Sequence, residues 1–255
     1  MERFSSEFMD MFDESMDHIN QFKKNKYPEV VSELWAKYES LITESLEYYK
    51  ALKDSEDSAA SAEVLAEALA GHAHKKMEQA SKRMQEVQAI DLNLTMAVYF
   101  IPLIRYTKTP EGDALAETFV KAWNQLPVTP MTLQSSTFED VNGGFKTKLC
   151  YITTAVCQYQ GKADDCYELT TLRSYRDSYL MNSQEGRALV EEYYELAPRL
   201  VMTMRMLPKE ETLYQELYRD YLLPCLHLIE AGRNEDCKDL YVDMVLGLKE
   251  RFVSS

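Results

Sequence analysis

The chain has 255 residues, enough to bury a substantial core as one large domain or two smaller ones. Apolar residues make up 45% of it, with only 8 glycines and 8 prolines, which excludes a disordered chain and argues against a loop-rich or all-β protein. The net charge is −14 and no lysine- or arginine-rich stripe interrupts it, so we expect no nucleic-acid partner and no anionic membrane surface as a partner.

The chain opens on an acidic sequence, MERFSSEFMDMFDESMD, which lacks the basic and apolar regions of a secretion signal. Its most apolar run, Met96–Ile104, is much shorter than the roughly 20 residues that span a bilayer. We therefore expect this run to be a buried core helix and expect no membrane insertion. The five cysteines favour free thiols in a reducing compartment, and together these features predict a soluble, cytoplasmic protein.

The N-terminal half is predicted to be helical because apolar residues recur there every three or four positions. Thr109-Pro110-Glu111 combines a capping hydroxyl, a first-turn proline and a first-turn acid, which is typical of a helix start. Pro102 is expected to end or kink the helix before it. The predicted helices cover residues 4–24, 28–53, 59–88, 92–101 and 110–125.

The segment 126–145 is expected to be irregular, because it contains two prolines, a threonine- and serine-rich run and Asn142-Gly143-Gly144. A connection of this length is often functional. Helices are predicted again over 147–160, 164–181, 184–206, 208–231 with a kink near Pro224, and 235–253. The fold class is therefore all-α, a compact array of about eight to ten helices with negligible strand. We expect an N-terminal helical region, 1–88, and a helical domain, 89–255.

Part of the second region carries a dense series of sequence elements in a fixed order. They are Cys150-Tyr151-Ile152-Thr153-Thr154-Ala155, Leu172-Arg173-Ser174-Tyr175-Arg176-Asp177, Gly186-Arg187-Ala188, Tyr193-Tyr194 and Pro198. Over residues 150–205 this series resembles the bacterial CFI-box C-terminal domain. The resemblance implies a compact helical module and no particular reaction. The chain departs from that family at Val156-Cys157-Gln158, where the family has Ala-Tyr-Gly, and in continuing well past the box.

Cys150 is the candidate catalytic residue. It lies near the start of a predicted helix, with Lys146 and Lys148 just before it. Free backbone N–H groups at a helix start and nearby cations both stabilise a thiolate, which is the setting of a reactive cysteine. The alternative is a buried structural thiol, because cysteine is among the most frequently buried residues.

Arginines form the second candidate group. Arg173 and Arg176 share a helical face, and Asp177 lies four residues from Arg173. They could lock neighbouring helices through ion pairs, or together with Arg187 bind an anion beside Cys150. If consecutive helices are antiparallel, Arg173 or Arg176 returns level with Cys150, so we expect contact between them near residues 142–144.

A metal site is the third alternative, since Cys150, Cys157 and Cys166 could gather on a helical hairpin. The chain has no Cys-x-x-Cys pair, no Glu-x-x-His motif and no glycine-rich phosphate loop. We therefore expect no bound metal and no cofactor.

Two functions of different class remain open. The first is a non-enzymatic interaction or scaffold module for a protein or peptide partner, with residues 146–205 as its structural core. The second is a thiol-dependent enzyme or redox sensor that uses Cys150 and the nearby arginines. The candidate binding residues in either case are Arg173, Arg176, Asp177, Arg187, Thr154 and Tyr193. The sequence does not define an oligomeric state.

Overall fold

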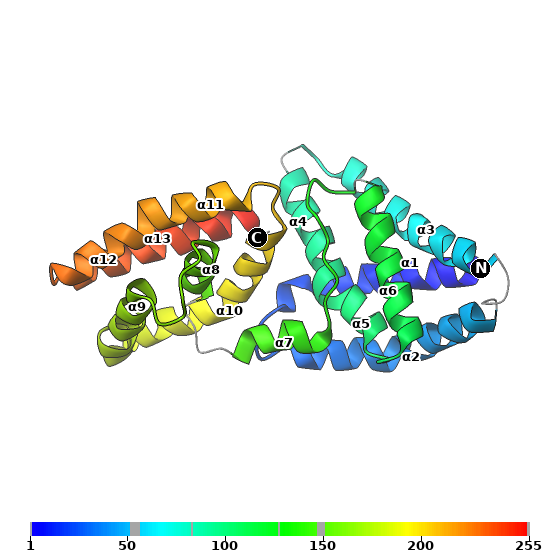
Figure 1. The fold of residues 1–255 in the computed structure, drawn as a ribbon, viewed down its shortest axis with the longest axis horizontal. Coiled ribbons are helices and arrows are strands. Elements are labelled where there is room, and N and C mark those ends of the chain that lie inside the picture. Colours follow the sequence, from blue (N-terminus) through cyan, green and yellow to red (C-terminus); the bar gives the residue numbers. More distant parts are fainter. Residues whose placement is uncertain (1, 52–56, 83, 127, 147–150, 254–255) are drawn as a thin grey trace. The chain divides into compact units, whose positions relative to one another are not determined.

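The computed structural model describes residues 2–51, 57–82, 84–126, 128–146 and 151–253. Over these ranges the chain is all-α and has no strand, as predicted. Eleven helices are described when each helix that contains a π-helical turn is counted once, against the eight to ten expected. The chain divides into two compact units, Met1–Gly144 and Phe145–Ser255, which are described separately (Figure 1).

One long helix forms the centre of the N-terminal unit. It consists of α4 (Gln85–Thr95), a π-helical turn (Met96–Phe100) and α5 (Ile101–Arg105). Helices of the same unit pack around it: α1 (Glu2–Asp17), α2 (Tyr27–Ala51), α3 (Asp57–Gln79) and α6 (Pro110–Gln125). The expected boundary after residue 88 falls inside α4. Because α4 packs against α1 and α3, the compact unit extends beyond that point to Gly144.

The predicted burial of Met96–Ile104 is confirmed, since every residue of this run is buried. The Phe100 ring lies in an aromatic cluster, with centroids 5.0 Å from Phe119, 6.0 Å from Phe8 and 6.1 Å from Phe12. The whole helix, Gln85–Arg105, is long and apolar enough to cross a membrane by length and composition. However, 89% of its apolar window is buried inside the structure, as in the core helix of a soluble domain.

The helix does not end near residue 101: it begins at Gln85 and continues past Pro102 to Arg105, with a π-helical turn just before the proline. The alternative that Pro102 kinks the helix stays a prediction. In the π-helical turn the Ile101 N–H bonds to the Met96 carbonyl, one residue further back than in an α-helix. Because the Ile101 N–H bonds to Met96, it does not bond to the Ala97 carbonyl. Pro102 has no N–H that could bond to the Val98 carbonyl, so the carbonyls of Ala97 and Val98 both need other partners. The Ser136 hydroxyl donates to Ala97, and the Tyr27 hydroxyl donates to Val98 at 2.9 Å.

The expectation of an irregular segment over 126–145 is wrong at its end, where α7 (Phe138–Lys146) forms. Thr137 and Asp140 cap its first turn reciprocally: the Asp140 N–H donates to the Thr137 hydroxyl at 3.1 Å, and the Thr137 N–H donates to the Asp140 carboxylate at 3.0 Å. The Phe138 ring also stacks on Tyr27, with centroids 5.6 Å apart. These contacts outweigh the low helix propensity of Gly143 and Gly144.

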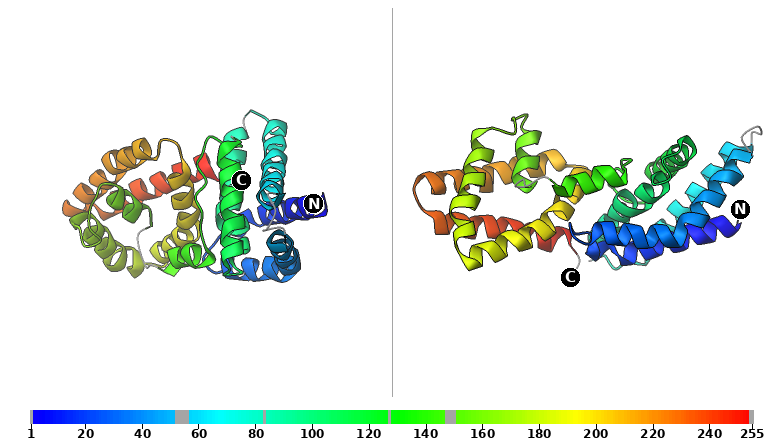
Figure 2. Two further views of the ribbon diagram at one scale, coloured as in Figure 1. Left: turned by 45° about the vertical axis from the view of Figure 1, so that its right-hand side comes forward. Right: turned by 90° about the horizontal axis from the view of Figure 1, so that it is seen from below.

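The C-terminal unit is built around a short buried helix, α8 (Tyr151–Tyr159), whose residues 152–157 are buried. Three helices pack on α8: α9 (Tyr167–Ser178), α10 (Gln184–Met206) and α11 (Glu210–Leu217). A second π-helical turn (Tyr218–Leu222) joins α11 to α12 (Leu223–Glu230), and α13 (Asn234–Phe252) follows. Helices α10, in yellow, and α13, in red, pack together and run in the same direction (Figures 1 and 2).

Candidate functional site

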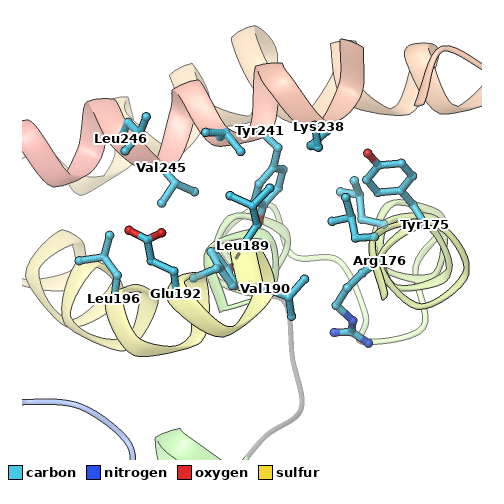
Figure 3. Close-up of a pocket in the computed structure, with 14 residues that line it drawn as sticks. Tyr175, Arg176, Leu189, Val190, Glu192, Leu196, Lys238, Tyr241, Val245 and Leu246 are labelled. Carbon is cyan, nitrogen blue, oxygen red and sulfur yellow. Dashed lines mark hydrogen bonds between the residues drawn. The ribbon is translucent and has the colours of Figure 1, made fainter. Parts of the chain in front are cut away.

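A groove opens in the C-terminal unit between α10 and α13, and α9 bounds one end of it (Figure 3). The cavity has a volume of about 110 Å³. Its apolar walls are formed by Leu189, Tyr193 and Leu196 of α10 and by Tyr241, Val242, Val245 and Leu246 of α13. Tyr175, Arg176 and Lys238 lie at the α9 end, and Leu196 and Leu246 lie at the opposite end.

The apolar walls of the groove result from the spacing of apolar residues along α10 and α13. Residues three and four apart share one face of a helix, so α10 and α13 each turn an apolar stripe toward the groove. On the α10 stripe Val190 is buried, whereas Leu189 and Leu196 are half-buried. On α13 Leu246 is 45% exposed, although leucine is usually buried. The groove is therefore an apolar surface that the unit itself covers only in part.

A chain of hydroxyls connects the groove to the start of α8. The Ile152 N–H, one of the donors left free at a helix start, bonds to the Tyr193 hydroxyl at 2.9 Å. Tyr241 donates to that hydroxyl at 3.4 Å and lies 3.1 Å from the Thr153 hydroxyl. The two tyrosines thus present their rings to the groove while their polar ends are satisfied at α8. Sequence reasoning identified Tyr193 but missed Tyr241.

The cations at the α9 end already have partners. Arg176 bonds to both carboxylate oxygens of Asp177, at 2.7 and 3.0 Å, and donates to the Tyr194 hydroxyl at 3.0 Å. Lys238 lies 2.6 Å from Glu235 and 3.4 Å from Glu185. The charge of each is therefore balanced within the unit, at one end of the groove.

The other predicted binding residues do not line the groove. Arg173 forms an ion pair with Asp164 at 2.7 Å, and Arg187 donates to the Met181 carbonyl at 2.9 Å. The hydroxyl of Thr154 is buried in α8 and has no hydrogen-bond partner within the described part of the chain. The arginines therefore tie helix ends to adjacent loops, and the prediction that they bind a ligand stays a prediction.

Cys150 lies outside the described residues, so its predicted contact with Arg173 or Arg176 stays a prediction. The next residue, Tyr151, begins α8, and its ring centroid lies 6.0 Å from that of Tyr194. Tyr194 in turn accepts the hydrogen bond from Arg176. The start of α8 and the α9 end of the groove are therefore joined through two aromatic residues.

The remaining cysteines are free thiols. Cys157, Cys225 and Cys237 are buried, and Cys166 is half-buried. Burial, with a smaller contribution from Cys166, raises the pKa of the Cys157 thiol to about 12, so Cys157 is protonated at neutral pH. Within the described ranges, no three cysteine, histidine, aspartate or glutamate side chains are arranged to hold a metal ion.

A partly buried polar cluster that sequence reasoning missed joins three segments of this unit. Lys162, in the loop after α8, donates to the Glu168 carboxylate and, at 2.6 Å, to the Tyr218 hydroxyl. Tyr218 also donates to Glu168 at 2.9 Å. Burial alone would raise the pKa of Glu168, but the hydrogen bonds from Lys162, its own backbone N–H and Tyr218 hold that pKa at about 2. The only signal in the sequence was an acid near the start of the helix predicted over 164–181.

This cluster predicts a pH-dependent stability. Because the folded pKa of Glu168 lies below its ordinary value, the stabilisation is complete above about pH 4.5 and is lost as the pH falls toward 2. We expect Glu168→Gln to lower the free energy of unfolding by about 3 kcal/mol at pH 7 and to have little effect near pH 2. Urea unfolding between about pH 2 and pH 7 measures the difference in the free energy of unfolding between variant and parent. The control is Glu216→Gln, at an exposed position. A constant difference between Glu168→Gln and the parent would contradict the assignment.

Comparisons with known proteins add no identification: no family model, no curated protein and no solved structure matches the chain. The resemblance of residues 150–205 to the CFI-box C-terminal domain therefore stays a prediction.

Proposed function

We propose that the C-terminal unit is a non-enzymatic interaction module whose groove receives an amphipathic helix of a partner protein. The observation that carries this proposal is the half-covered apolar stripe between α10 and α13, in which Leu246 is 45% exposed. Exposed apolar surface with polar residues around it is a place where another protein can bind. The scaffold beneath it is well fixed, because Tyr193 and Tyr241 are hydrogen-bonded at α8.

A helix fits the shape of the groove. Its two walls are parallel helices, and their side chains present ridges at helical spacing that a third helix can enter. On α10 the stripe runs from Leu189 to Leu196, which at 1.5 Å per residue is about 10 Å, or two helical turns. A partner helix with apolar residues at positions i, i+3, i+4 and i+7 would cover it, as in other helix-in-groove complexes.

The chemistry of the lining favours binding over catalysis. Of the described residues that line the groove, none is a serine, threonine, cysteine or histidine. Its charged residues, Arg176, Glu192 and Lys238, each have an opposite charge within 4 Å. A cysteine thiol, which a thiol-dependent enzyme requires, is therefore not among the described residues of this surface. The thiol-dependent alternative rests on Cys150 and stays a separate prediction.

A synthetic helix tests the proposal. The probe is a fluorescent 18-residue peptide with leucines at helical spacing and glutamine elsewhere, and fluorescence anisotropy measures its binding. We expect saturable binding that Leu246→Asp weakens about tenfold or more, because a charge would replace an exposed apolar contact in the groove. Leu126→Asp is the matched control, since Leu126 is 43% exposed but belongs to the other unit. No binding, or equal weakening by both variants, would contradict the proposal.

A further inference from the structure

The rim of the groove is acidic, and this constrains its partner. On α13, Asp239 lies three residues before Val242, Asp243 lies three before Leu246, and Glu250 lies four after Leu246. Residues at these spacings are neighbours on one helical face, so the three acids border the apolar stripe. All three are exposed, and none forms a salt bridge within the part of the chain that the structure describes.

The opposite rim has the same sign. Glu185 lies four residues before Leu189, and Glu192 lines the groove itself. Two lysines partly offset these acids: Lys238 pairs with Glu185 and Glu235, and Lys249 lies 3.8 Å from Glu192. With the Arg176–Asp177 pair at the α9 end included, seven acids therefore face three cations around the apolar stripe, and the chain as a whole carries a charge of −14.

We infer that the partner helix is basic, with lysines or arginines flanking its apolar stripe. This inference rests on the proposed function and specifies the chemistry of its partner. A basic helix would place its cations against Asp239, Asp243 and Glu250, whose charges are otherwise unbalanced, and complementary potentials speed association and exclude wrong partners. A second copy of this chain would instead bring two acidic rims together, and like charges in apposition are unfavourable.

Three peptides that differ only in charge separate this inference from the proposed function. They share the leucine stripe and have glutamine, lysine or glutamate on the other face. At low salt we expect the lysine peptide to bind roughly tenfold more tightly than the glutamine peptide, and the glutamate peptide to bind more weakly still. The advantage of the lysine peptide should shrink as salt is raised, because exposed charges are screened.

Variants locate the effect. Combining Asp239→Asn, Asp243→Asn and Glu250→Gln should remove most of the lysine peptide's advantage over the glutamine peptide. Combining Asp165→Asn, Glu191→Gln and Glu216→Gln removes the same charge from exposed positions that do not line the groove, and should leave the advantage intact.

The outcomes are distinct. Equal binding of the lysine and glutamine peptides would overturn the inference while the groove remains a helix site. If both triple variants reduced the lysine peptide's advantage equally, the inference would also be overturned, because the net charge of the chain would then explain the advantage. If none of the peptides binds, the proposed function itself fails. Sedimentation that shows a dimer which Leu246→Asp dissociates would assign the groove to a second copy of the chain.

Discussion

Replacing Val98 with aspartate is expected to unfold the N-terminal unit. Val98 is fully buried in the π-helical turn of the central helix, and its carbonyl accepts the Tyr27 hydroxyl. An unpaired carboxylate there has neither water nor a partner, so we expect a loss of about 4 kcal/mol or more in the free energy of unfolding. Because a domain is stabilised by only about 5–15 kcal/mol, this loss is a large part of the free energy of unfolding. Ile101→Asp, at an equally buried position, should behave in the same way.

Tryptophan fluorescence measures this effect selectively, because both tryptophans, Trp35 and Trp123, belong to the N-terminal unit. Thermal and urea unfolding of Val98→Asp should shift strongly in this signal. The matched control is Val64→Asp, which makes the same change in the same unit at a valine that is 50% exposed. Melting of Val98→Asp at the temperature of the parent would contradict the role of this helix as the core.

Replacing Gly186 with alanine is expected to destabilise the C-terminal unit. An added Cβ would lie 2.1 Å from the Leu180 carbonyl oxygen and 2.7 Å from the Leu180 carbonyl carbon. These are backbone atoms, so the clash cannot be relieved by a change of side-chain rotamer. The close approach brings the 3₁₀ turn Leu180–Asn182 onto the first turn of α10, where the Ser183 hydroxyl accepts the Gly186 N–H at 2.9 Å. We expect a loss of roughly 3 kcal/mol from this overpacking.

Thiol labelling follows the C-terminal unit, because Cys157, Cys225 and Cys237 are buried there. Labelling of these three cysteines in urea, read by mass spectrometry, should begin at lower urea in Gly186→Ala than in the parent. Gly247→Ala is the control: it lies within α13, and nothing lies within 4 Å of its added Cβ. Because alanine favours a helix over glycine by about 0.5–1 kcal/mol, this variant should be slightly stabilised. Shifts of the same sign in both variants would contradict the steric argument.

The sequence predicted helices best where their ends carry local signals. α10 begins at Gln184 and ends at Met206 as predicted, because Ser183 caps its start and Pro208 follows its end. α6 begins after Thr109 for the same reason, with the Thr109 hydroxyl accepting the Gly112 N–H at 3.1 Å. In both cases the deciding hydrogen bonds lie within three residues of the helix start, so sequence reasoning captures them.

Tertiary contacts determine what the sequence could not. α7 forms despite Gly143 and Gly144 because its side chains pack against distant residues such as Tyr27, and the central helix passes Pro102 because Tyr27 and Ser136 satisfy its freed carbonyls. The groove was missed for a related reason. Helical spacing shows that α13 has an apolar stripe, but not that this stripe faces α10, some 50 residues earlier in the sequence, across a partly open surface.

The π-helical turn Met96–Phe100 also changes the angular register of the central helix. One extra residue in a turn rotates everything after it by about 100° relative to an uninterrupted α-helix. Before the turn α4 packs on α1 and α3, and after it α5 packs on α2 and α6. A single helix thereby serves two pairs of neighbours on different sides. The same residues in an uninterrupted α-helix would turn 101–105 by about 100° from the faces that now meet α2 and α6, whereas a chain one residue shorter at this turn would form a regular helix and keep those faces in place.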